Sequence, residues 1–331
     1  MTSIALESLI HEIPSETTPG ERNLLIQLFS KAWSGKGTVV EIGPFLGGTT
    51  RAIALGMLGN PNRDPAARLH TFDRFDDYYT PANLRKMINP LVVSGSFNEQ
   101  QAQDLCASGN FLGIFHAIHA PHAYGELICA HSSPLPDFPQ EVAGSSSLSI
   151  LDDDYSLSGL FIDGCKSWAS THYAMKFLLP RTLPGARLIF QDYGWYTCFW
   201  ISAFVYAFRD KLNWHEHIDA TYVFSLKHPI TAAEIEAHFA TTPDAMGAQF
   251  FKDSCLYLLQ DSIARQDVRG ALIAQLHFVA ALATIGRKPD ALKILKAIKP
   301  HEYGGLAGMI LGSLKSPTYS PGNKPILWTD R

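Results

Sequence analysis

The segment from residue 38 to residue 50, TVVEIGPFLGGTT, most constrains the fold of this chain. A β-branched run ends next to an acid, turns through glycines and enters an expected helix. Glycines at such a turn adopt positive φ and let the backbone approach a ligand closely, and a threonine that follows can cap the helix. Neither G-x-G-x-x-G nor G-x-x-x-x-G-K-[ST] occurs here, which argues against a pyrophosphate or triphosphate ligand. We therefore expect a cofactor loop of another kind.

Apolar runs alternate with helical patterns along the next 180 residues, which predicts a mainly parallel sheet with both faces covered. A helix with the capping box Thr18–Glu21 precedes the first strand. Residues 217–227 are expected to supply the last one or two strands, antiparallel at the sheet edge. Other strands are expected at 38–42, 68–72, 126–130, 158–162 and 186–190, and helices at 49–58, 81–88, 169–179 and 197–210.

The order of these patterns predicts a nucleotide-type domain over residues 1–229 and a helical C-terminal extension over residues 230–331. We interpret residues 76–125 as a substrate lid, since an insertion after the second strand lies above the ligand edge of such a sheet. A mobile surface insertion without a catalytic part is the alternative. Residues 132–156 are expected to form an exposed loop. Residues 270–298 resemble one tetratricopeptide-like hairpin, and a single copy favours a packed appendage or a homodimer surface.

Composition excludes several classes of protein. Hydrophobic residues make up 46% and charged residues 18%, as expected of a globular enzyme, and a net charge of −4 argues against a nucleic-acid partner. The apolar run at residues 197–208 is shorter than the roughly 20 residues that span a bilayer, so we expect no membrane association. The beginning of the chain lacks a secretory pattern, and five scattered cysteines without a C-x-x-C pair favour a reducing, cytoplasmic location.

The motif Glu41-x-Gly43-x-x-x-Gly47-Gly48-x-Thr50 resembles the first motif of class I S-adenosylmethionine (SAM)-dependent methyltransferases. That family has a Rossmann-like sheet with helices on both faces. Asp73, at the end of the second apolar run, matches the acid that binds the ribose hydroxyls in family members. The resemblance implies that SAM contacts Glu41, Gly43, Phe45, Gly47, Thr49, Thr50, Asp73, Arg74 and Asp163, with His131 and Ser132 near the adenine.

Two further strand ends, LFIDGCKSW at 160–168 and PGARLIFQDY at 184–193, carry Asp163 and Asp192. They resemble the "I-D-G-D-H" and "G-G-x-x-x-x-D-Y" motifs of the macrocin-type sugar and natural-product O-methyltransferases. The resemblance implies O-methylation of a hydroxylated small molecule, with Asp163 and Asp192 facing the acceptor. An amine acceptor would need much the same pocket, so O- rather than N-methylation rests on the resemblance alone.

Methyl transfer requires that a hydroxyl proton is removed at some stage. The candidate bases are Asp192, Lys166 and His172, and we prefer Asp192. Asp163 and Asp192 together could also hold Mg²⁺, as some family members do, although an ammonium at Lys166 would oppose the ion. A zinc site is considered at His116, His119, His122 and His131, but no evident ligand completes it.

Two alternatives stay open. The fold could serve as a binding or assembly module that has lost catalysis, or as a SAM-binding enzyme of a non-methylating reaction, for which Cys165 and Lys166 would be natural novelties. The aromatic residues after Asp192 could wall an acceptor pocket or belong to the core.

Overall fold

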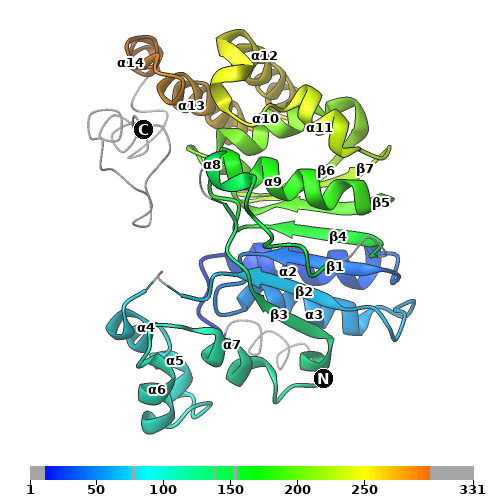
Figure 1. Cartoon of the computed structure of the whole chain (residues 1–331), viewed down its shortest axis with the longest axis vertical. Helices are drawn as coiled ribbons and strands as arrows, with labels where there is room; N and C mark the ends of the chain where they lie inside the picture. The colour runs from blue at the N-terminus through cyan, green and yellow to red at the C-terminus, as the bar shows by residue number, and fades with distance from the viewer. Residues whose placement is uncertain (1–11, 77–78, 137–138, 152–154, 299–331) are drawn as a thin grey trace.

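The computed structural model describes residues 12–76, 79–136, 139–151 and 155–298. Its centre is a seven-stranded sheet in the order β3-β2-β1-β4-β5-β7-β6, with β7 antiparallel to both of its neighbours (Figure 1). The remaining pairings are parallel, so the predicted fold class is confirmed. The strands are β1 (Thr38–Ile42), β2 (Leu69–Asp73), β3 (Ile128–Ser132), β4 (Leu157–Ile162), β5 (Thr182–Phe190), β6 (Leu212–Ile218) and β7 (Thr221–Leu226).

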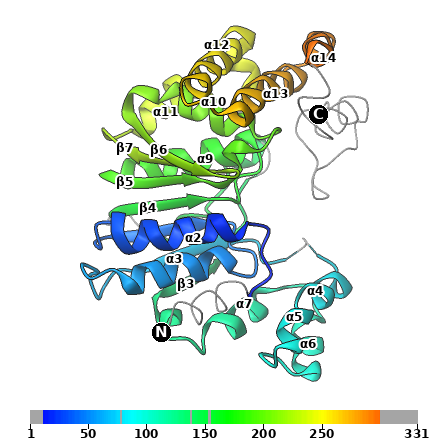
Figure 2. The ribbon, with the colours of Figure 1, turned by 180° about the vertical axis from the view of Figure 1, so that it is seen from behind.

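Successive residues of the buried strands point to opposite faces of the sheet, and each face has its own core. Val39 and Phe161 pack with α2 (Pro19–Gln27), the π-helical turn η1 (Leu28–Ala32) and α3 (Gly48–Gly59). Val40 and Leu160 pack on the other face, with α9 (Trp168–Leu178) and α10 (Phe199–Ala207). Figures 1 and 2 show α2 and α3 on the side of the sheet opposite α9. The predicted capping box is present, because Thr18 accepts from the Glu21 amide and Glu21 from the Thr18 amide.

The insertion after β2 is helical and has a small core of its own. Its helices are α4 (Pro81–Met87), α5 (Asn89–Val93), α6 (Glu99–Cys106) and α7 (Leu112–His119), followed by the 3-10 turn η2 (Ala123–Leu127). Buried side chains of these helices pack together with Leu46, just after β1, and Phe75, just after β2. The insertion is thereby attached to the ends of the two strands (Figure 1).

Between β3 and β4, the described residues include α8 (Pro139–Val142). We expected an exposed loop over 132–156. Leu148 and Leu151 are instead fully buried, and the Leu148 amide donates to the Tyr173 hydroxyl of α9 at 3.3 Å. These two leucines follow the serine run 145–147, and the exposed Ile150 lies between them, so the local composition does not distinguish the buried residues from the exposed one. Residues 137–138 and 152–154 of the predicted loop lie outside the described ranges.

The C-terminal helices are α11 (Ala232–His238), α12 (Pro243–Ala264), α13 (Val268–Thr284) and α14 (Lys288–Ala297). They lie at the end of the sheet opposite the α4–α6 insertion (Figure 1), and their buried side chains belong to the same core as β5, β7 and α10. The predicted extension beyond residue 298 falls outside the described residues. Short 3-10 turns are η3 (Leu179–Arg181), η4 (Gln191–Gly194) and η5 (Arg209–Lys211). Within the described ranges, every helix is too short or too polar to cross a bilayer.

Candidate active site

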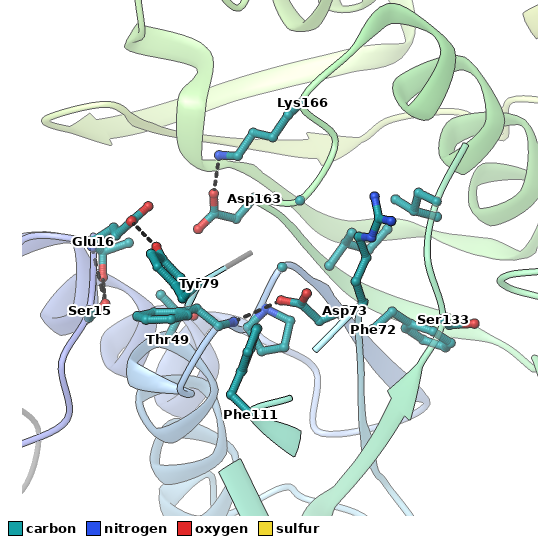
Figure 3. A pocket seen from close by; sticks show the side chains of 18 residues that line it. Ser15, Glu16, Thr49, Phe72, Asp73, Tyr79, Phe111, Ser133, Asp163 and Lys166 are labelled. Atoms are coloured by element: carbon teal, nitrogen blue, oxygen red, sulfur yellow. Dashed lines mark hydrogen bonds and ion pairs between the residues drawn. The ribbon is translucent and has the colours of Figure 1, made fainter. Parts of the chain in front are cut away.

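A cavity lies outside the carboxyl ends of β1, β2 and β4, where the strand order reverses between β1 and β4. Open α/β sheets bind their ligands at this kind of position. The cavity and its open mouth together hold about 860 Å³ of empty space. Its walls come from the strand ends, from the segment before α2 and from the insertion after β2 (Figure 3).

The glycine loop after β1 lies close to other segments of the protein as well as to the cavity. Gly43 has a φ of +86°, lines the cavity, and would bring an added Cβ to 2.5 Å from the Gly164 amide nitrogen. Gly47 has a φ of +91° and is the N-cap residue of α3. A Cβ at Gly47 would lie 1.8 Å from Nε2 of His119 on α7. Only glycine fits either position, and at residue 47 the reasons are the positive φ and the contact with α7 of the insertion.

Glu41 is completely buried beside the first turn of α3. The hydroxyls of Thr49 and Thr50 each donate to one of its carboxylate oxygens at 2.6 Å. Burial raises the pKa of Glu41 to about 7, although both hydrogen bonds act in the opposite direction. Glu41 and Thr50 are not among the residues that line the cavity, whereas Thr49 is. In the structure both carboxylate oxygens of Glu41 contact the helix that follows, and its contact with the cofactor stays a prediction.

Asp73 lies at the end of β2 and faces the cavity (Figure 3). Its carboxylate accepts from the amides of Phe45 and Phe75, both at 3.2 Å. Phe45 and Phe75 have φ values of +52° and +57°, a left-handed conformation that is uncommon for residues other than glycine. Asp73 thus stabilises the two turns that form this wall, and Phe45 and Arg74 line the cavity beside it.

His131 and Ser132, predicted to lie near the adenine, do not line the cavity; Ser133 and Leu135 do. His131 stacks on Phe72, and its Nε2 lies 3.0 Å from Nδ1 of His70. Burial lowers the pKa of His131, and it lowers the pKa of His70 to about 4. At neutral pH, one neutral ring therefore donates to the other.

Lys166 lies between the two strand-end aspartates. Its Nζ is 2.7 Å from Oδ1 of Asp163 and also forms an ion pair with Asp192 (Figure 3 shows the first contact). Burial opposes the positive charge of Lys166, but the two carboxylates outweigh it and hold the lysine pKa well above its ordinary value. Burial raises the pKa of Asp163 to about 6 in spite of the ammonium. Asp163 and Lys166 line the cavity, and Asp192 contacts it through Lys166.

The predicted Mg²⁺ site does not fit this arrangement. The position between the two carboxylates holds the Lys166 ammonium, which would repel a divalent cation. Among the described residues, no three His, Cys, Asp or Glu side chains gather as metal ligands. The histidines considered for zinc have other partners: His119 contacts the Leu46 carbonyl oxygen, and His122 contacts Arg51.

His172 does not join these residues. It is buried in α9, where its Nε2 lies 3.6 Å from a carboxylate oxygen of Glu236 and its ring stacks on Phe239, both on the C-terminal side of the fold. The aromatic residues that follow Asp192 are also core residues, since Tyr193, Tyr196 and Trp200 are buried. The structure therefore favours packing over an acceptor wall for these rings.

Sequence reasoning missed one wall of the cavity. Ser15, Glu16 and Thr17, in the segment before α2, line it together with Tyr79 and Phe111 of the insertion. The Tyr79 hydroxyl donates to Glu16 at 2.8 Å and joins the two segments (Figure 3). The segment before α2 shows no motif, whereas the place of the insertion after the second strand predicted that it would lie at this edge of the sheet.

No protein-family model matches this sequence, and no curated protein matches it. Solved structures that it resembles include several O-methyltransferases. The O-methyltransferase NovP is 16% identical, with 69% of this chain and 82% of that chain covered and a TM-score of 0.37. A putative O-methyltransferase from Klebsiella pneumoniae is 13% identical, with 69% and 92% covered and a TM-score of 0.41. An O-methyltransferase from Bacillus cereus, solved in complex with SAH, is 11% identical, with 68% and 88% covered and a TM-score of 0.39. Similarity at this level assigns neither an activity nor a substrate to this chain.

Proposed function

We propose that this chain is a SAM-dependent methyltransferase that acts on a hydroxyl group of a small molecule. The observation that carries the proposal is the cavity at the reversal point of the sheet. It brings the Gly43 turn, the Asp73 carboxylate and the Asp163 carboxylate to one space, in the order in which the sequence motifs predict them.

The walls of the cavity suit the parts of SAM. A carboxylate accepts several hydrogen bonds at once, so Asp73 can bind ribose hydroxyls while it holds the two turns. Leu135 offers apolar surface to the adenine. The positive sulfonium would meet the negative charge of Asp163 and Glu16 on the opposite side.

In the proposed reaction, the acceptor oxygen forms a bond to the methyl carbon while the bond between that carbon and sulfur breaks. The electron pair of the broken bond stays on sulfur, which leaves S-adenosylhomocysteine (SAH), and the hydroxyl proton passes to a carboxylate. Asp163 lines the cavity and is the nearest candidate for that proton, with Asp192 behind Lys166 as the second. The protein would align the two reactants and exclude water, which supplies much of the rate in such displacements.

Turnover tests this proposal. The protein is incubated with SAM and a panel of phenols, sugars and sugar nucleotides, and mass spectrometry detects the methylated product. We expect Asp192→Asn and Asp163→Asn to lower turnover by about 10²–10⁴-fold, the range for loss of a general base, with SAM binding retained in Asp192→Asn, whose side chain does not line the cavity. Retained turnover in both variants would remove these carboxylates from the mechanism.

SAM binding and product analysis distinguish this proposal from the two alternative functions. A well-folded protein that binds neither SAM nor SAH would support a binding or assembly module. SAM consumption without a methylated product would support a non-methylating reaction. A homodimer through the C-terminal helices and a cytoplasmic location stay predictions.

A further inference from the structure

We propose that the Lys166 ammonium takes the place of a divalent cation in this site, bridging Asp163 and Asp192 and presenting its remaining N–H to the acceptor oxygen. This inference rests on the proposed methyl transfer and names the group that would orient the acceptor. It makes the reaction independent of a metal.

Hydrogen bonds hold the backbone that carries the three side chains. The Asp163 and Gly164 amides donate to the Ile42 carbonyl oxygen at 2.9 and 2.8 Å, which fixes the end of β4 against the end of β1. Trp200 of α10 donates from its indole nitrogen to the Cys165 carbonyl oxygen at 3.0 Å. The turn that carries Lys166 is therefore held from two sides.

Asp192 is fixed independently of that turn. It belongs to the 3-10 turn η4 after β5, and the Gly194 amide of this turn donates to the Ala220 carbonyl oxygen at 3.1 Å. The two carboxylates thus come from neighbouring strands and converge on one point. Lys166 Nζ occupies that point, 2.7 Å from Asp163 and in direct contact with Asp192.

The Lys166 ammonium has one donor more than the two carboxylates use. A lysine ammonium has three N–H donors and no acceptor. Asp163 and Asp192 take two of them, and the side chain of Lys166 also lines the cavity. One donor is left for an oxygen in the cavity. A bridging cation in this position would likewise contact both carboxylates and the acceptor oxygen.

The charges of the cluster also favour the ammonium over an added divalent cation. Asp163 and Asp192 carry up to two negative charges, and Lys166 compensates one of them inside a partly buried cluster. An additional divalent ion would place three positive charges against two negative ones. The cluster is therefore complete with the ammonium, and it becomes a vacant cation site only when that ammonium is removed.

Metal binding by variants tests this inference without any methyl acceptor. Mn²⁺ is titrated into the wild-type protein, Lys166→Ala and Lys176→Ala, with free Mn²⁺ followed by electron paramagnetic resonance and folding followed by thermal melting. Lys176 is a matched control, because it lies on α9 and pairs with Glu236 away from the cavity. We expect Lys166→Ala to bind Mn²⁺ about tenfold or more tightly than either other protein, since two uncompensated carboxylates favour a hard cation. The double variant Lys166→Ala with Asp192→Asn should lose this gain.

Every other pattern overturns the inference. Equal Mn²⁺ binding by wild type and Lys166→Ala would mean that the lysine does not occupy the cation position. No binding by Lys166→Ala would mean that the two carboxylates do not form such a position. If Lys166→Ala fails to fold, Lys166→Met replaces it in the same comparison. SAM binding is measured separately, so a protein that binds no SAM contradicts the proposed function while the Mn²⁺ comparison still judges Lys166.

Discussion

The buried carboxyl group of Glu41 should make the free energy of unfolding depend on pH. Its pKa of about 7 lies above the ordinary value of 4.5, so between these pH values the folded state holds a proton that the unfolded state has released. The contribution of Glu41 to the free energy of unfolding should therefore be highest below pH 4.5 and fall by about 3 kcal/mol as pH rises to 7. Glu41→Gln should lack this fall, since an amide does not ionise.

Urea unfolding of wild type and Glu41→Gln at several pH values from 4.5 to 7.5 measures this difference. Burial lowers the pKa of His119 to about 3. Such buried histidines lower the free energy of unfolding of the protein as pH falls below the ordinary histidine pKa of 6.5. They act equally in both proteins, so the difference isolates Glu41. Parallel pH profiles for the two proteins would show that Glu41 is ionised throughout.

Gly47 allows a second test at a single residue. Gly47→Ala introduces both a strained φ and a contact 1.8 Å from His119 Nε2, whereas Gly286→Ala has a φ of +72° and no atom within 4 Å. We expect Gly286→Ala to cost about 1 kcal/mol from the left-handed conformation alone. Gly47→Ala should cost clearly more, and adding His119→Ala to it should recover part of the loss. Equal costs for the two glycines in urea unfolding would contradict the contact.

Single residues show where sequence reasoning succeeded and where it stopped. Asp73, Gly43 and Asp163 were predicted to lie together and do so, because parallel strands end at one edge of the sheet. Glu41 was assigned to the cofactor, but side-chain direction alternates along β1 and places it inside, against two threonines. His172 follows β4 in sequence, yet its turn of α9 faces the C-terminal helices. Neither orientation could be read from the motif alone.

At the scale of elements, the contact between the segment before α2 and the insertion after β2 should affect ligand exchange. Tyr79→Phe removes the hydrogen bond to Glu16 but keeps the ring, which packs on Phe45 at 5.2 Å. If SAM occupies the cavity, we expect SAH to dissociate about two- to tenfold faster, the effect of losing roughly 0.5–1.5 kcal/mol. Stopped-flow fluorescence measures the rate.

Tyr206→Phe, on α10 at the other end of the fold, is the matched control and should leave the rate unchanged. Unchanged dissociation from Tyr79→Phe as well would show that the contact does not hold the ligand.

Elements with strong patterns were predicted within a few residues, and weakly patterned ones were not. β1 was expected at 38–42 and lies at Thr38–Ile42, because a β-branched run bounded by glycines has one interpretation. β6 begins at Leu212, whereas the strand was expected from residue 217. It is an edge strand whose Asn213 and Glu216 face solvent, and these polar residues hide the apolar pattern at its beginning. The described part of the insertion contains four short helices, α4 to α7, where one was expected, since their buried side chains form one cluster that also includes Leu46 and Phe75.

At the scale of the whole molecule, the C-terminal helices and the sheet should unfold together. Leu276 of α13 is fully buried in the core that also contains Phe190 of β5, whereas Leu183 is 40% exposed. Leu276→Ala should lower the free energy of unfolding by about 2–5 kcal/mol, and Leu183→Ala by about 0.5 kcal/mol or less. Both tryptophan fluorescence and far-UV circular dichroism should report one shifted transition. A separate early transition in Leu276→Ala would indicate that the helices unfold on their own.

The central claim is that the cavity at the end of β1, β2 and β4 binds SAM. Isothermal titration calorimetry with SAM and SAH tests it most directly, on wild type, on Asp73→Asn and on Asp253→Asn as a surface control on α12. We predict saturable binding of one ligand per chain, weakened at least about tenfold by Asp73→Asn, since hydrogen bonds to a charged group are worth roughly 1.5–3 kcal/mol, and unchanged by Asp253→Asn. Absence of binding by folded wild-type protein, or equal binding by all three proteins, would contradict this assignment.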